Sequence, residues 1–145
     1  MRLVYFTARK SETVSSLRTL SGTAAGATPT LCRVGLYGVA ANGDLTLLAS
    51  TANTTSLWSA ATTRYDTALS ASYAVTAGIR YAVGLLCVTG ASLPTVYVNN
   101  GGAAAEVGLD PRLCGVVAGL TDLPSSVTAA SVGDTAVRPY GVLLP

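Results

Sequence analysis

The feature that most constrains the fold is a predicted β-hairpin between Leu31 and Ser50. Its two halves, LCRVGLYGV and LTLLAS, have the apolar content of strands and flank the turn sequence Asn42-Gly43-Asp44. Asparagine and glycine tolerate the positive φ angles that tight hairpin turns require. Because a hairpin pairs neighbouring strands antiparallel, this segment favours an antiparallel β-fold.

The remainder of the chain continues the same pattern. Runs rich in Val, Leu, Tyr and Thr are separated by Gly, Pro, Asn, Asp and Ser, and few have the apolar period of a helix. Ten strands in one flat sheet would leave a large apolar face in water, so we expect an all-β, two-sheet antiparallel β-sandwich of jelly-roll or related Greek-key topology. A single domain over residues 1–145 is expected. The predicted strands are Leu3–Ala8, Thr13–Ser21, Leu31–Val39, Asp44–Thr51, Thr63–Leu69, Tyr73–Thr76, Ile79–Thr89, Thr95–Val98, Cys114–Ala118 and Ala136–Leu143.

Three segments between the strands are less regular. Thr54–Ala61 is expected to form a brief helix or an ordered loop, because a Thr or Ser can cap a short helical turn. Residues 103–113 are expected to hold a turn of helix that ends at Asp110-Pro111. Gly119–Val132 is polar enough to predict a long surface connection.

One strand is predicted to be central and buried on both faces. From Tyr81 to Val88 every residue is apolar, so one face should meet the sandwich core and the other a neighbouring subunit or a covering loop. Only 11% of the residues are charged, against roughly 25% in an ordinary soluble domain. Such a surface favours self-association, and we expect an oligomer.

Three cysteines, Cys32, Cys87 and Cys114, cannot all pair within one chain. Each lies in an apolar strand, where a free cysteine behaves as a small hydrophobic residue. Buried free thiols are therefore the expectation, with a Cys32–Cys87 disulfide as the alternative.

The composition argues against most chemistry. The sequence has no histidine, which excludes Ser-His-Asp triads, Cys-His pairs and histidine-containing zinc sites, and it has no phosphate-binding glycine motif. Its seven acidic residues lie in or near predicted turns, the ordinary place for solvated carboxylates. We therefore predict no catalytic residue, no metal and no cofactor. The acidic residues are Glu12, Asp44, Asp66, Glu106, Asp110, Asp122 and Asp134.

Nucleic acid and membrane are not expected as partners. The net charge of +2 comes from scattered basic residues, with no cluster larger than Arg9-Lys10. The longest apolar runs are far shorter than the roughly 20 residues of a membrane-spanning helix. The first residues enter a strand-like run at once, so no signal peptide is expected from them.

A binding function without a catalysed reaction is the remaining class, and the candidate ligand is a sugar. β-Sandwich domains that bind sugars need aromatic rings for the apolar sugar face and planar polar groups for the hydroxyls. For Trp58, the alternative is that the ring packs one end of the sandwich beside Leu57. The candidate glycan-binding residues are Trp58, Arg64, Tyr65, Asp66, Tyr97, Asn99 and Asn100.

Five segments carry a resemblance to a known group: VYFTARKSETVSSLR, TPTLCRVGLYGVAANGDLTLLAST, VTAGIRYAVGLLCV, LTDLPSSV and PYGVLL. In this order they resemble the β-sandwich domain of minor tail proteins and tail fibres of bacteriophages that infect actinobacteria. The resemblance implies a structural virion protein, and assembly in the host cytoplasm is expected. The resemblance also implies a homotrimer that contacts other virion proteins and adheres to a host-envelope glycan. The alternative is a capsid decoration or assembly protein with no ligand. No enzymatic activity is expected, and a depolymerase that cleaves envelope polysaccharide is the third interpretation.

Overall fold

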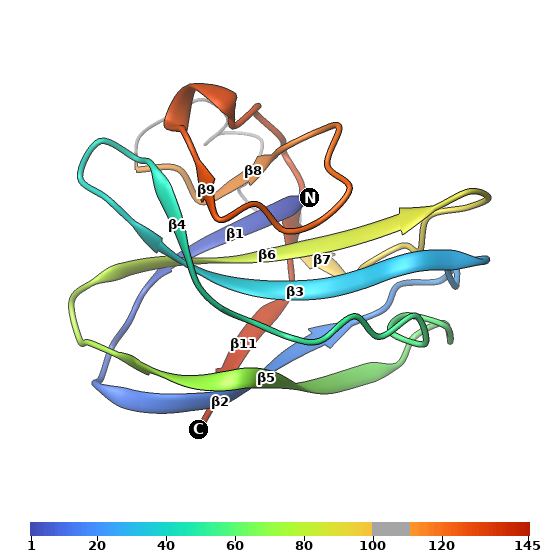
Figure 1. The fold of residues 1–145 in the computed structure, drawn as a ribbon, viewed down its shortest axis with the longest axis horizontal. Helices are drawn as coiled ribbons and strands as arrows, with labels where there is room; N and C mark the ends of the chain where they lie inside the picture. Colours follow the sequence, from blue (N-terminus) through green and yellow to red (C-terminus); the bar gives the residue numbers. More distant parts are fainter. Residues whose placement is uncertain (100–110) are drawn as a thin grey trace.

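The computed structural model describes residues 1–99 and 111–145, which form an all-β fold (Figure 1). Those residues include one 3-10 turn, η2 (Ala129–Ser131), and no α-helix. Over the same ranges, no helix has the length and apolar character needed to cross a membrane. The strands are β1 (Arg2–Thr7), β2 (Glu12–Leu20), β3 (Pro29–Val39), β4 (Leu45–Ser50), β5 (Arg64–Val75), β6 (Arg80–Thr89), β7 (Val98–Asn99), β8 (Cys114–Val116), β9 (Ser126–Val127), β10 (Arg138–Pro139) and β11 (Gly141–Leu144).

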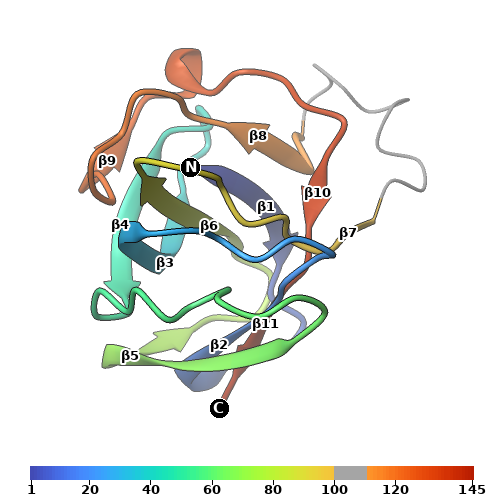
Figure 2. The ribbon, with the colours of Figure 1, turned by 90° about the vertical axis from the view of Figure 1, so that its right-hand side faces the viewer.

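The strands form two antiparallel layers (Figure 2). The large sheet has the order β8-β1-β6-β3-β4-β9, and the small sheet has the order β11-β2-β5. A two-stranded ribbon, β10-β7, lies beside them. The chain crosses repeatedly between the two sheets. As a result, β6 pairs with β1 and β3 in the large sheet, although the strand before it in the sequence, β5, belongs to the small sheet. The predicted two-sheet antiparallel sandwich is confirmed.

The predicted hairpin is β3-β4, and its turn is longer than the tightest kind. The Ala40 amide donates to the Asp44 carbonyl at 2.9 Å, and the Gly43 amide donates to the Ala40 carbonyl at 2.9 Å. Gly43 has a φ of 86°, whereas Asn42 does not adopt a positive φ. This is a three-residue loop whose last residue is left-handed, a position that glycine fills without steric cost.

β5 joins two strands that the sequence predicted separately, Thr63–Leu69 and Tyr73–Thr76. Its register against β2 shifts between Val14 and Ser16. Because of this irregularity, Val14 and Leu17 both face the core although they are three residues apart, which simple alternation along a strand would not allow.

The C-terminal prediction was too coarse. The predicted strand Ala136–Leu143 is divided into β10 and β11, which pair with different partners, β7 and β2. β9 was not predicted. Thr54–Ala61 contains turns and no helix, so the ordered-loop alternative is the one observed. The helical turn predicted at 103–113 falls almost wholly outside the described residues.

The main core lies between the two sheets. The small sheet contributes Val14 and Leu17, and the large sheet contributes Val34, Leu36 and Val83, all almost fully buried. The ordered loop after β4 adds Leu57 and Trp58 to this cluster.

A second apolar cluster covers the opposite, outer face of the large sheet. Tyr37 and Ala82 on that face pack with Val117, Val127 and Val132 from the segment that follows β8. The segment thus corrects the prediction of a loose surface connection at Gly119–Val132. It also supplies the covering loop that was one of two predicted partners for the outer face of β6.

Two contacts hold this covering segment, Val117–Val132, in place. The Arg33 guanidinium bonds the Asp122 carboxylate at 2.8 Å, and the Tyr37 hydroxyl donates to the Pro124 carbonyl at 3.2 Å. At Gly115, a Cβ atom would lie 2.4 Å from a methyl group of Val132, so only glycine allows this approach.

Candidate functional site

The outer face of the small sheet gathers charged side chains from adjacent strands. In the sheet register, Arg18 of β2 lies between Asp66 of β5 and Val142 of β11. Arg18 donates to both carboxylate oxygens of Asp66, from Nε at 2.7 Å and from Nη2 at 2.8 Å. Arg64 places its Nε 3.6 Å from the same carboxylate. This bidentate geometry holds the planar groups in one orientation.

Two exposed tyrosines adjoin this charged row. The Tyr97 amide donates to the Leu20 carbonyl at the end of β2, and the Tyr140 amide donates to the Tyr97 carbonyl, both at 2.9 Å. Tyr97 is 58% exposed and Tyr140 is 37% exposed, which is unusual for large apolar rings in this chain. With Arg138 they line a depression of about 480 Å³, which Arg18, Arg64 and Asp66 do not line. We call Arg18, Arg64, Asp66, Tyr97, Arg138 and Tyr140 the tyrosine–arginine face.

The Arg18–Asp66 pair is charged at neutral pH. The hydrogen bonds from Arg18 lower the pKa of the Asp66 carboxyl, and Arg64 adds to this effect. In return, the hydrogen bond to Asp66 raises the pKa of Arg18, to which Tyr140 also contributes electrostatically. The face therefore offers a carboxylate acceptor, guanidinium donors and two exposed aromatic rings, which is the chemistry that recognises sugars.

Comparison with known proteins gives no relative. No protein-family model matches the chain, and no curated protein or solved structure matches it. The resemblance to phage tail domains stays a prediction from the sequence motifs, and function is inferred from the residues of the site.

Three of the predicted glycan-binding residues, Arg64, Asp66 and Tyr97, belong to the tyrosine–arginine face. Tyr65 does not, because alternation along β5 turns it inward, where it packs against the core and its hydroxyl accepts the Ala60 amide at 2.9 Å. Asn99 pairs through its backbone register with Arg138 in the ribbon. Asn100 lies outside the described residues.

Trp58 requires a correction. Its side chain is only 1% exposed, and its indole Nε1 donates to the Thr19 hydroxyl at 2.9 Å inside the core. A buried ring cannot stack on a sugar, so Trp58 leaves the candidate set, and the packing role beside Leu57 is the one that the structure supports.

Arg18, Arg138 and Tyr140 were missed. No local motif marks them, because Arg18 reaches Asp66 only through pairing of strands that are distant in sequence. Tyr140 lies inside the predicted strand Ala136–Leu143 and was given no role. The available signal was its position directly after Pro139, because proline is usual at the edge or end of a strand.

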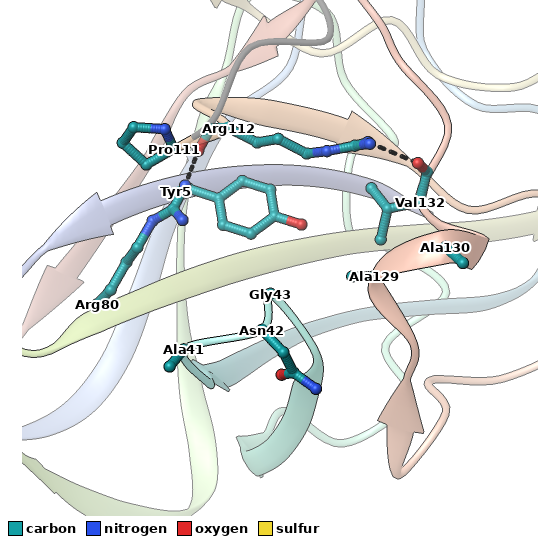
Figure 3. Close-up of a pocket in the computed structure, with 10 residues that line it drawn as sticks. All are labelled: Tyr5, Ala41, Asn42, Gly43, Arg80, Pro111, Arg112, Ala129, Ala130 and Val132. Carbon is teal, nitrogen blue, oxygen red and sulfur yellow. Dashed lines mark hydrogen bonds between the residues drawn. The ribbon is translucent and has the colours of Figure 1, made fainter.

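A larger hollow of about 560 Å³ lies near the β3-β4 turn (Figure 3). Its two arginines have structural partners. The Arg80 guanidinium stacks 4.9 Å from the Tyr5 ring centre and donates to the Arg112 carbonyl. Arg112 donates to the Val132 carbonyl at 2.6 Å and pairs with Asp134 at 3.1 Å. These arginines tie β8 to the covering segment, so we do not assign the hollow as the binding site.

Metal ligands do not gather in the described part of the chain. Within residues 1–99 and 111–145, no three His, Cys, Asp or Glu side chains come close enough to hold an ion. The tyrosine–arginine face, with a single carboxylate between two guanidinium groups, is suited to hydrogen bonding rather than to cation binding.

Proposed function

We propose that this domain is a structural component of a bacteriophage tail that recognises a host-envelope glycan through the tyrosine–arginine face. Two observations carry the proposal: Tyr97 and Tyr140 are exposed, and Tyr140 is close enough to the fixed Arg18–Asp66 pair to affect the pKa of Arg18. The resemblance of the sequence motifs to phage tail domains supports the biological setting.

The binding mechanism follows from the residue types. A pyranose ring presents an apolar face, which an exposed tyrosine covers while its hydroxyl stays in water. Sugar hydroxyls around that face can then donate to Asp66 and accept from Arg138 or Arg64. Because Arg18 already holds Asp66, little side-chain entropy is lost when the carboxylate binds a hydroxyl.

Replacing Tyr97 or Tyr140 with alanine should weaken glycan binding at least tenfold while the fold stays intact. Each substitution removes one aromatic surface, and both rings are already exposed, so little core packing is lost. Binding to envelope glycan isolated from actinobacterial cell walls can be measured by biolayer interferometry, with circular dichroism to check folding.

The matched control is Ile79→Ala, which removes another exposed apolar side chain, 49% accessible, outside the tyrosine–arginine face. This variant should bind like the unmodified protein. If both tyrosine variants bind as tightly as the unmodified protein, the tyrosine–arginine face is not the glycan-binding site. If the unmodified protein binds no envelope glycan, the decoration or assembly alternative is favoured.

We also propose that the domain associates as a homotrimer and contacts other virion proteins. The supporting observation is the sparse charge, 11% of residues, which leaves much of the surface without charged groups. Multi-angle light scattering should give three times the chain mass of 14.6 kDa. A mass equal to one chain at micromolar concentration would contradict self-association.

A further inference from the structure

Cys32 and Cys87 lie directly opposite each other in the centre of the large sheet. They are register partners in the antiparallel β3-β6 ladder, and their Sγ atoms are 3.1 Å apart with both thiols free. β3 and β6 share more contact than any other strand pair in the described residues, so the two sulfurs are held in place by a rigid scaffold.

The backbone geometry at this pair suits a covalent bond. The Cys32 amide donates to the Asn53 side chain at 2.9 Å, and the Cys32 carbonyl accepts the Thr54 amide at 3.0 Å. Both polar groups therefore point away from β6, and Cys32–Cys87 is a non-hydrogen-bonded pair. In such pairs the Cα atoms are about 4.5 Å apart, within the range that disulfides span.

The two sulfurs differ in access. Cys87 is partly exposed and lines a cavity of about 260 Å³ together with Leu93 and Pro94. Cys32 is fully buried, and this burial, with the hydrogen bond to Cys87, raises the pKa of its thiol to about 12. A small oxidant therefore meets Cys87 first, and Cys32 remains protonated until it reacts.

We propose that Cys32 and Cys87 form a cross-strand disulfide when the domain meets a low-molecular-weight disulfide, such as oxidised glutathione. The Cys87 thiolate attacks one sulfur of the oxidant, which forms a mixed disulfide and releases the first thiolate. Cys32 then loses its proton to solvent and attacks the Cys87 sulfur, which expels the second thiolate. In total, two cysteine thiols are oxidised and one oxidant disulfide is reduced to two thiols.

Cys114 is too distant to compete. It is the register partner of Val4, which in turn pairs with Val83 on β6. Cys87 lies four residues farther along β6, roughly 13 Å at the usual rise per residue, and two strands away. The Cys114 thiol donates to the Thr135 carbonyl at 3.0 Å instead.

The sequence makes the test unambiguous, because trypsin places each cysteine on a separate peptide. Cleavage after Lys or Arg puts Cys32 in peptide 19–33, Cys87 in peptide 81–112 and Cys114 in peptide 113–145. The folded full chain is incubated with oxidised glutathione, alkylated, digested without reductant and analysed by mass spectrometry. We expect peptides 19–33 and 81–112 to be linked, 113–145 to be alkylated, and dithiothreitol to reverse the link.

Three variants test the order of the steps. Cys32→Ser should trap glutathione on Cys87, Cys87→Ser should give no adduct and no link, and Cys114→Ser should form the link at the wild-type rate. The proposal is overturned if all three wild-type cysteines remain alkylatable, if glutathione stays on wild-type Cys87 without closure, or if peptide 113–145 takes part in the link.

Discussion

Leu86→Lys should leave the domain largely unfolded. Leu86 is 3% exposed on the outer face of β6, and its register partner on β3 is Arg33, already a cation. A lysine there would bury a second positive charge without a partner, which costs several kcal/mol against a total stability of roughly 5–15 kcal/mol. Far-UV circular dichroism during urea titration should show a loss of more than about 4 kcal/mol, or no folded baseline at all.

The same substitution separates two interpretations of the outer face. If that face were a contact between subunits, the lysine variant would stay folded and would only dissociate. Because Leu86 is already 3% exposed within a single chain, unfolding is expected instead. Leu93→Lys is the control, since Leu93 is 63% exposed and a charge there stays in water. A folded, monomeric Leu86→Lys protein would show that the outer face of β6 is not buried within a single chain.

Trp58→Ala should reduce the free energy of unfolding by about 3–5 kcal/mol, the usual loss when a large aromatic side chain is removed from a core. The ring fills the space between the sheets beside Leu57, and its indole satisfies the buried Thr19 hydroxyl. The alanine variant loses both the packing and the hydrogen bond. Urea unfolding followed by circular dichroism measures the difference.

Trp58→Phe separates the contribution of the hydrogen bond to Thr19 from the contribution of packing. Phenylalanine retains much of the apolar volume but cannot donate to Thr19, so the expected loss is about 1–3 kcal/mol. Glycan binding by this variant should equal that of the unmodified domain, because the ring is inside the core. A stability change below about 1 kcal/mol for Trp58→Ala, or a selective loss of binding, would show that the ring acts at the surface.

Local patterns predicted most of the strands. The hairpin, the central position of β6 and the two-layer arrangement all follow from alternation and turn residues, which act over a few positions. The turn itself differed in detail, because Gly43 alone supplies the left-handed residue. The separation of β10 from β11 and the register shift of β5 against β2 depend on which strand each segment pairs with, and that information is not local.

The site could be predicted only in part, for a similar reason. Arg64, Asp66 and Tyr97 have residue types that suggest sugar binding, but so does Trp58, and only burial distinguishes the aromatic rings that reach solvent. Arg18 joins the face through pairing of β2 with β5, and Tyr140 joins it through its backbone hydrogen bond to Tyr97. Residue type indicates which interactions a side chain can make, whereas the pairing of strands decides which other side chains lie beside it.

The C-terminal strands also determine when the fold can be completed. β8 closes one edge of the large sheet on β1, β9 closes the other on β4, and β11 closes the small sheet on β2. All three partners are made early in synthesis, and long loops must close before these contacts form. Each of these three edges stays open until its own C-terminal strand has left the ribosome, and the β2 edge stays open longest because β11 ends at Leu144. An open edge can accept the same strand from a neighbouring nascent chain. Crowded synthesis therefore favours exchange of these C-terminal strands between copies, and slow, dilute refolding favours the closed single chain.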